Sequence, residues 1–286
     1  MLVSSFPPSP ETVRGLQERA ARALPAEHVE HVGGWWLRRS ASSSWWRGTV
    51  LPHGDASRDE LLSMISDAER FYAGFGVATR FQVSPGACPA DLEATLAERG
   101  YRWNSPMSLQ TALTVDVQAQ ARRDGPSIRL NETPTSAWLQ LWYAVHGYGS
   151  DPQIEWEMLG RVTQPSAYAS ALEGGEVIAV GRAVADAAWT GVFGMATLPA
   201  ARGRGAARSI LASLADWATA QGADSMYLQV ECDNDPALHL YERTCFTEVC
   251  GYHYRTESTS GERAPTPALL CTGSDRLRAP VLGVRA

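Results

Sequence analysis

A glycine-rich turn between two regular segments is the feature that most constrains how this chain folds. Residues 191–198 are predicted as a strand that Pro199 ends, and residues 206–221 have the apolar period of a helix. The turn Arg202-Gly203-Arg204-Gly205 joins them. The first N–H groups of a helix lack partners within the helix, and the helix dipole is positive there. This order of strand, glycine turn and helix predicts an α/β fold with an anion-binding helix end.

The turn contains the residue types that a phosphate site needs. Gly203 and Gly205 allow a ligand to approach the backbone closely, and Ala207 is small enough for the turn to pack. Positive charge is added by Arg202, Arg204 and Arg208. Glycine turns with arginine also occur as plain surface connections. The dinucleotide-binding pattern G-x-G-x-x-G is absent, since the next glycine after Gly205 is Gly222.

The composition of the chain limits the kinds of partner that it is expected to bind. The net charge of -6 and the sequence pI of about 5.6 argue against nucleic acid, so no DNA partner is expected. All 25 basic residues are arginines, whose planar guanidinium groups suit phosphate. The five cysteines include no C-x-x-C pair, and no metal site is predicted. No apolar run reaches the ~18 residues that cross a bilayer, and no signal peptide is found, which predicts a cytoplasmic protein without a membrane partner.

The length of 286 residues has room for two domains. Predicted helices lie at residues 60–72, 91–99, 136–145, 154–162, 206–221 and 237–243. Predicted strands lie at residues 45–51, 78–83, 107–113, 127–130, 167–172, 177–184, 191–198 and 226–232, with a final pair at 246–250 and 251–256. These elements predict an N-terminal domain (1–115), a polar linker (116–126), a second domain (127–256) and a flexible tail (257–286).

The two halves share a local pattern. Phe81-Gln82-Val83 precedes a helix that ends at Gly100-Tyr101, and Leu228-Gln229-Val230 precedes one that ends at Cys245-Phe246. The positions at the start of the two patterns are 147 residues apart, and those at the end are 145 residues apart. This predicts that the same fold occurs twice in the chain. In this register, Leu96 corresponds to Tyr241.

Two motifs around the turn resemble the acetyl-CoA-binding core of the GNAT N-acyltransferase superfamily. Residues 202–207 match its R-x-x-G-x-[GA] signature, and residues 234–243 match its N-x-x-A-x-x-x-Y-E-[RK] pattern. The resemblance covers residues 177–256 closely, and the tandem layout is similar to that of two-domain members such as the mycothiol synthases. It implies an α/β (α+β) protein of two GNAT-like domains, each with a mixed, mostly antiparallel, splayed sheet flanked by helices.

The resemblance also implies which residues contact acetyl-CoA. The pantetheine arm would lie between residues 195–197 and 228–231 as an extra strand, and the turn would hold the diphosphate. The implied cofactor-binding residues are Met195, Ala196, Thr197, Arg202, Gly203, Arg204, Gly205, Ala206, Ala207, Asn234 and Ala237. His146 lies in the region that borders the acceptor in similar proteins, although an isolated histidine is more often structural.

Tyr241 stands at the family's position for the general acid that protonates the departing thiolate. Attack of an amine on a thioester also needs a base that keeps the amine neutral. Glu231 is our first candidate for this base, ahead of Asp233 and Glu155. Cys245 replaces the family's usual glycine, so either the turn avoids positive φ or a side chain is tolerated there at some strain.

The function that the resemblance implies is transfer of an acetyl group from acetyl-CoA to a primary amine of a small molecule, by direct attack in a ternary complex. Two alternatives stay open: another activated donor, such as a longer acyl-CoA, a carrier-bound acyl group or an aminoacyl-tRNA, and a CoA-binding protein without catalysis. The N-terminal half lacks the arginine–glycine turn and has Leu96 in place of Tyr241. We therefore expect it to be a degenerate copy that binds no CoA and helps to shape the acceptor pocket. The residues neither predict nor exclude a dimer.

Overall fold

The computed structural model describes residues 9–40, 47–120, 125–146 and 151–258. The first half of the chain forms α1 (Pro10–Ala23), β1 (His28–Val32), β2 (Trp35–Arg39), β3 (Val50–Leu51), α2 (Arg58–Gly74), β4 (Arg80–Val83), α3 (Leu92–Glu98) and β5 (Arg102–Leu113). The second half forms α4 (Thr114–Gln118), β6 (Ser127–Asn131), α5 (Ser136–His146), α6 (Pro152–Gly160), β7 (Ser166–Glu173), β8 (Glu176–Asp186), β9 (Trp189–Thr197), α7 (Ala206–Ala220), β10 (Ser225–Glu231), α8 (Asp235–Glu242) and β11 (Thr247–Thr256).

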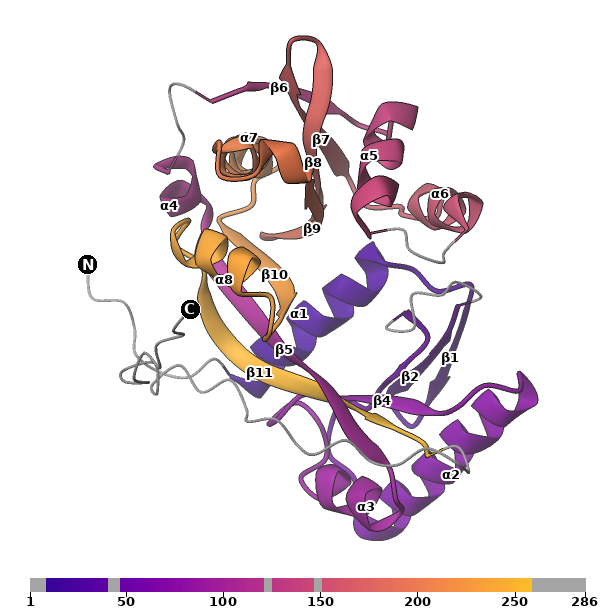
Figure 1. The fold of residues 1–286 in the computed structure, drawn as a ribbon. Coiled ribbons are helices and arrows are strands. Elements are labelled where there is room, and N and C mark those ends of the chain that lie inside the picture. Colours follow the sequence, from indigo (N-terminus) through magenta and orange to yellow (C-terminus); the bar gives the residue numbers. More distant parts are fainter. Residues whose placement is uncertain (1–8, 41–46, 121–124, 147–150, 259–286) are drawn as a thin grey trace, which may run out of the picture.

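The eleven strands of the described residues belong to one sheet, in the order β1-β2-β3-β4-β11-β5-β10-β9-β8-β7-β6 (Figure 1). Neighbouring strands are antiparallel except for two parallel pairs, β3 with β4 and β9 with β10. Helices cover the sheet, which confirms the predicted fold class of a mixed, mostly antiparallel sheet flanked by helices. Among the described helices, none is both long and apolar enough to cross a membrane.

The two halves exchange their last strands. β5 comes from the first half but pairs with β10, and β11 comes from the second half but pairs with β4. β5 and β11 also pair with each other along their length, so they form the centre of the sheet (Figure 1). The predicted pair of strands at 246–250 and 251–256 is therefore wrong: these residues form one strand, because its partners come from the first half.

The predicted domain boundaries separate the chain into two halves, but strands of both halves belong to one continuous sheet. Residues 114–118 of the boundary region form α4, and residues 121–124 of the predicted linker lie outside the described residues. Residues 259–286 of the predicted tail lie outside them too. Glu257, its first residue, donates its backbone N–H to the Thr79 carbonyl, so the start of this segment contacts the first half.

The helix α1, which the sequence analysis did not predict, lies where the two halves meet (Figure 1). The Ser9 side chain caps it, and its apolar residues face a cluster that includes Leu109 of β5 and Tyr227 of β10. Its buried Gln17 accepts hydrogen bonds from Gln82 of β4 and Gln229 of β10, each at 2.5 Å. These two glutamines are the pair that the sequence pattern placed 147 positions apart, so α1 joins corresponding points of the two halves.

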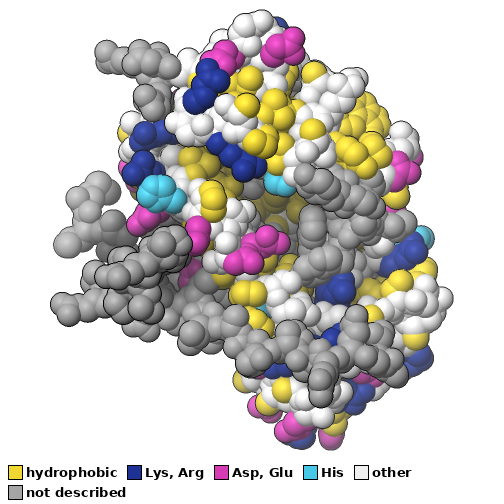
Figure 2. Space-filling model, in the orientation of Figure 1, with side chains coloured by type: hydrophobic (Ala, Val, Ile, Leu, Met, Phe, Trp, Pro, Cys, Tyr) yellow, Lys and Arg dark blue, Asp and Glu magenta, His cyan; other side chains and the backbone are white. Residues whose placement is uncertain are grey.

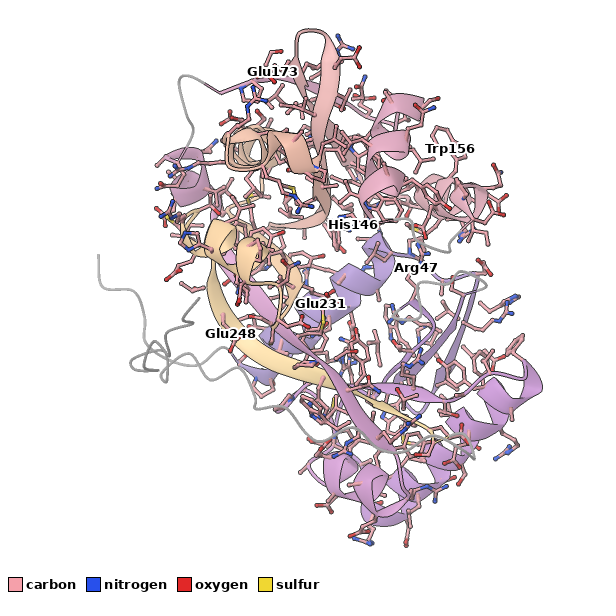
Figure 3. All side chains as sticks on the ribbon, in the orientation of Figure 1. Arg47, His146, Trp156, Glu173, Glu231 and Glu248 are labelled. Atoms are coloured by element: carbon pink, nitrogen blue, oxygen red, sulfur yellow. The ribbon has the colours of Figure 1, made fainter. Side chains whose placement is uncertain are left out.

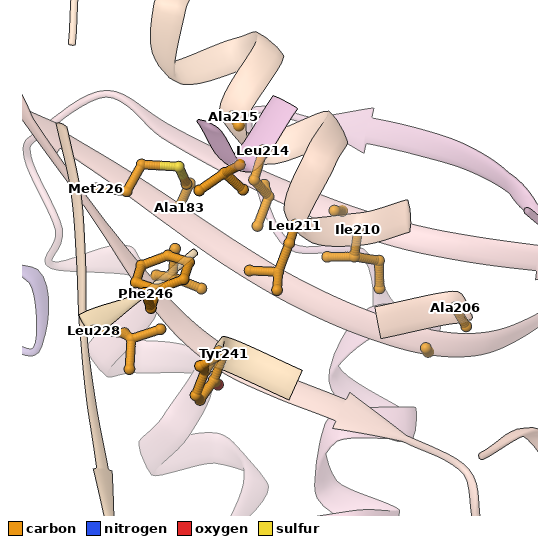
Figure 4. Packing of buried hydrophobic residues seen from close by; sticks show 14 of the residues in the cluster. Ala183, Ala206, Ile210, Leu211, Leu214, Ala215, Met226, Leu228, Tyr241 and Phe246 are labelled. Carbon is orange, nitrogen blue, oxygen red and sulfur yellow. The ribbon is translucent and has the colours of Figure 1, made fainter. Parts of the chain in front are cut away.

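The main hydrophobic core lies between the second half's sheet and α7 and α8 (Figure 4). Ile210, Leu211 and Leu214 of α7 are fully buried against β7, β8 and β9. Leu228 of β10 and Tyr241 of α8 complete this core. α5 and α6 pack with a separate cluster that contains Tyr168 and Val180. The glycine turn before α7 is thus fixed on a helix whose apolar face is buried.

Candidate functional site

The strands β9 and β10 separate after a short parallel contact. They pair only at Trp189–Gly191 and Ser225–Tyr227, and beyond this point β9 follows β8 while β10 follows β5. The register of β8 and β9 shifts at Gly194, which has a φ of +59°. A side chain there would lie 3.3 Å from Trp138, so the bulge needs glycine. The face drawn in Figure 2 is hollowed where the two strands separate, and hydrophobic side chains form the floor of the hollow.

The glycine turn opens α7 without a capping side chain. Gly205 is the N-cap residue, with a φ of +88°, and no acidic residue lies in the first turn. Ala206 is buried, whereas Gly203 is exposed with open space around its Cα. The first N–H groups of α7 therefore lack a side-chain acceptor and sit at the positive end of the helix dipole.

The arginines of the turn have nearby partners. Arg204 forms an exposed ion pair with Glu173, which lies in the hairpin between β7 and β8 (Figure 3). Arg208 donates to the Gln120 side chain at 3.0 Å. Arg202 donates through Nε to the carbonyl of Thr197 at 3.4 Å. These contacts keep three guanidinium groups around the start of α7.

The corresponding helix of the first half, α2, is closed by its own side chains. Ser57 and Glu60 form a capping box, in which the Ser57 hydroxyl accepts from the Glu60 N–H and the Glu60 carboxylate accepts from the Ser57 N–H. Asp59 adds a second negative charge to the first turn. The anion position at this helix start is therefore taken by a carboxylate of the chain.

Two carbonyls on the open edge of β9 have side-chain partners that the sequence did not predict. Leu198 donates its N–H to Ile178 of β8, so alternation along the strand turns the carbonyls of Met195 and Thr197 toward the opening. Nε2 of His146, at the end of α5, lies 3.0 Å from the Met195 carbonyl oxygen (Figure 3). Thr197 is the residue that Arg202 contacts. Ala196, between them, is buried and pairs with β8.

Tyr241 is held at the end of α8 by the turn that follows it. The Phe246 N–H donates to the Tyr241 carbonyl at 2.9 Å, and the two rings pack edge to face at 5.8 Å. The side chain is 7% exposed, and burial raises its pKa to about 12. Its hydroxyl has no hydrogen-bond partner within the described part of the chain. Tyr241 is thus a buried phenol that keeps its proton at neutral pH.

Cys245 adopts a φ of +68° in this turn. The sequence allowed either a turn that avoids positive φ or a side chain tolerated with strain, and the second expectation is confirmed. Gly100, with a φ of +81°, holds the same position in the first half, where the Tyr101 N–H donates to the Leu96 carbonyl. This equivalence agrees with the predicted register of Leu96 and Tyr241.

Replacing Cys245 with glycine is expected to stabilise the protein by about 0.5–1 kcal/mol, because the left-handed strain is removed at some cost in unfolded-state entropy. Urea unfolding measures the change in free energy. Gly100→Ala is the matched opposite change and should destabilise the protein by about 1 kcal/mol. A C245G variant less stable than the parent would contradict this interpretation of the turn.

The three candidate carboxylates differ in their surroundings. Glu231 is exposed at the end of β10, close to the opening (Figure 3), and Asp233 is exposed in the loop after it. Glu155 is buried, and both its oxygens accept hydrogen bonds from Arg47, at 2.9 and 2.5 Å. Both carboxylate oxygens are therefore already occupied by the buried Arg47 guanidinium, which leaves neither of them directed at a ligand. The contacts of Glu155 are those of a structural ion pair, whereas Glu231 and Asp233 are exposed.

The motif residues around α8 have a local role. Asn234 is the N-cap residue, and its side-chain oxygen accepts from the Ala237 N–H at 3.2 Å. Asn234 is exposed and Ala237 is half-buried. No group of three His, Cys, Asp or Glu side chains that could hold a metal ion occurs in the described ranges. The site therefore consists of an uncapped helix start, an open strand edge, a buried phenol and exposed carboxylates.

Comparison with known proteins identifies the family of this chain and finds solved structures with the same fold. Residues 11–255 match the model of a family described as "Probable histone acetyltransferase Rv0428c C-terminal". The chain is 23% identical over 252 residues to an uncharacterised N-acetyltransferase of Bacillus subtilis, YobR, covering 86% of this chain and 98% of that protein.

Two solved structures illustrate the fold. A GCN5-related N-acetyltransferase from Kribbella flavida matches with a TM-score of 0.67 and 15% identity, over 87% of this chain and 95% of that chain. A tandem GNAT protein from the clavulanic acid biosynthesis pathway matches with a TM-score of 0.58 and 13% identity, over 88% and 97% of the two chains. The two-domain layout of the present sheet agrees with the tandem arrangement.

Proposed function

We propose the substrates of this chain, which belongs to the family described as "Probable histone acetyltransferase Rv0428c C-terminal". It is a tandem GNAT N-acetyltransferase. It transfers an acetyl group from acetyl-CoA to a primary amine of a small molecule, in a ternary complex. The observation that carries the proposal is the uncapped start of α7 beside the separation of β9 and β10.

The second half provides the groups that acetyl-CoA needs. The diphosphate binds to N–H groups of residues 203–207 with Arg202, Arg204 and Arg208 around it. The pantetheine arm lies along the open edge of β9, where Met195 and Thr197 present their carbonyls. Because Arg202 and His146 now contact these carbonyls, the arm exchanges or shares both hydrogen bonds when it binds. The first half binds no acetyl-CoA, because Glu60 and Asp59 occupy the start of α2.

Two side chains accept or donate protons during the acetyl transfer. Glu231 takes a proton from the acceptor ammonium, directly or through a water, which leaves a neutral amine. The amine nitrogen bonds to the thioester carbon, and the C–S bond then breaks. Tyr241 donates its hydroxyl proton to the departing sulfur, and the phenolate regains a proton from the amine that has been acylated. The net reaction converts an amine and acetyl-CoA into an amide and CoA.

The proposed function is tested by following thiol release from acetyl-CoA with a panel of small amines. Amine-dependent release at a rate above that of the buffer supports the transferase. Calorimetric binding of acetyl-CoA without release by any amine would instead favour the CoA-binding protein without catalysis. Absence of acetyl-CoA binding would contradict the proposed site.

Tyr241→Phe is expected to lower kcat by about a hundredfold, because general acid catalysis contributes about 10²–10⁴-fold. Acetyl-CoA affinity should change little, since the ring and its packing against Phe246 are kept. Steady-state kinetics and calorimetry measure the two quantities. Tyr101→Phe removes a hydroxyl that contacts Glu69 in the first half and should leave kcat unchanged. A Y241F variant with parental kcat would remove Tyr241 from the mechanism.

A further inference from the structure

A groove opens where α1, β2 and the segment after α6 meet. Its volume is about 250 Å³, and its lining includes Arg22, Arg38, Arg161, Thr163, Gln164 and Trp36. We call it the junction groove, because both halves of the chain contribute to it. The groove is therefore large enough for a small aromatic acid.

The junction groove is rich in positive charge, although the chain has a net charge of -6. Arg22 pairs with Asp186 at 2.8 Å, and Arg161 lies 3.5 Å from the Glu27 carboxylate. Arg39 also lies 3.7 Å from Glu27, so that carboxylate is shared between two guanidinium groups. Cations outnumber carboxylates here, which favours an anionic ligand.

Arg38 contributes a buried cation to the same groove. It is 4% exposed and donates to the Thr49 hydroxyl at 2.8 Å and to the Thr49 carbonyl at 3.3 Å. Burial lowers its pKa, because the charged form loses hydration. An anion in the groove would stabilise this charge.

Three shielded polar atoms at the groove lack hydrogen-bond partners among the described residues. They are Nε and Nη2 of Arg161 and the side-chain oxygen of Gln164. The 3.5 Å contact of Arg161 with Glu27 is an ion pair without hydrogen-bond geometry. Nε and Nη2 form one edge of the guanidinium, which can donate to two oxygens of a carboxylate or phosphate at once. Shielded donors without hydrogen-bond acceptors are costly, so the Arg161 guanidinium, which faces only Glu27 at 3.5 Å, favours a further acceptor nearby.

The rest of the lining is apolar. Trp36 of β2 faces the groove together with Pro25 and Val29, and Val29 is 43% exposed. We propose that the junction groove binds a small organic anion with a flat apolar body. Its carboxylate or phosphate binds among the guanidinium groups of Arg22, Arg38 and Arg161, and its body packs against Trp36.

Such an anion has two sources: a separate ligand, or the charged end of the acceptor itself. A smaller cavity of about 20 Å³ adjoins the groove, since Ala21 and Arg38 line both. Gln229, which also lines this cavity, lies two residues before Glu231 on β10. The second source rests on the proposed function, whereas binding of an anion in the groove does not.

Benzoate is the probe for the groove, and calorimetry with the full chain measures its binding. We expect one saturable site for benzoate and much weaker binding of benzyl alcohol, which has the same ring without charge. Arg161→Gln should weaken benzoate binding about tenfold or more, through loss of one of the three charges that line the groove. Gln164→Leu provides a second variant of the same wall, and Arg129→Gln on the edge strand β6 should bind as the parent does.

The proposal is overturned if benzoate does not bind, if benzyl alcohol binds as well, or if R161Q binds benzoate as the parent does. Inhibition kinetics then identify the source of the anion. Competition of benzoate with the amine indicates the acceptor's charged end, and unchanged amine KM indicates a separate ligand. Failure of every amine to release thiol would count against the proposed function and leave the calorimetric test of the groove intact.

Discussion

Gly205→Glu is expected to abolish measurable acetyl-CoA binding, with a rise in Kd of at least about a hundredfold. The new carboxylate would stand at the start of α7, where the N–H groups and helix dipole favour an anion, and would compete with the diphosphate. The glutamate side chain would also be strained at a φ of +88°. Calorimetry with acetyl-CoA measures the effect directly.

The matched control is Gly222→Glu. Gly222 follows the other end of the same helix, with a φ of +79° and open space around it. The two variants therefore add the same charge and a similar backbone strain to opposite ends of α7. G222E should keep the parental Kd although it loses at least as much stability, because its charge stands at the negative end of the helix dipole. Equal acetyl-CoA affinity in G205E and the parent would place the diphosphate elsewhere.

The parts of the site that the sequence predicted depend on contiguous residues. The turn at 202–205 follows a strand and precedes a helix, and each of these elements is specified by its own period and by the glycines between them. The equivalence of Leu96 and Tyr241 was also visible, because the turns that end α3 and α8 are short and local. What these residues bind stays a prediction that the variants above test.

The parts that the sequence did not predict depend on distant residues. The residues of β11 resemble a local hairpin, but their partners, β4 and β5, come from the other half of the chain. α1 was missed, although Ser9 and Pro10 form a readable helix start. The contact of His146 with Met195 joins the end of α5 to a strand edge, and neither residue type signals it. The ion pair of Glu155, a weaker candidate for the base, was not predicted because its partner, Arg47, lies 108 positions away.

Glu155→Leu is expected to destabilise the protein by about 3–5 kcal/mol, because it leaves the buried Arg47 guanidinium without its carboxylate. The pair is 2% and 4% exposed and links the first half to α6. A loss of this size is a large share of the roughly 5–15 kcal/mol that stabilises a typical domain. Urea unfolding followed by circular dichroism measures it, with the midpoint shifting to lower urea.

Two controls separate the buried charge from general effects of mutation. Glu98→Gln breaks the exposed pair of Arg58 and Glu98, whose side chains are 64% and 67% exposed, and should cost less than about 1 kcal/mol. Adding Arg47→Met to Glu155→Leu should restore most of the lost stability, since the buried charge is then absent. If the double variant were as unstable as E155L, the cost would come from packing between the halves, and the buried ion pair would not be its cause.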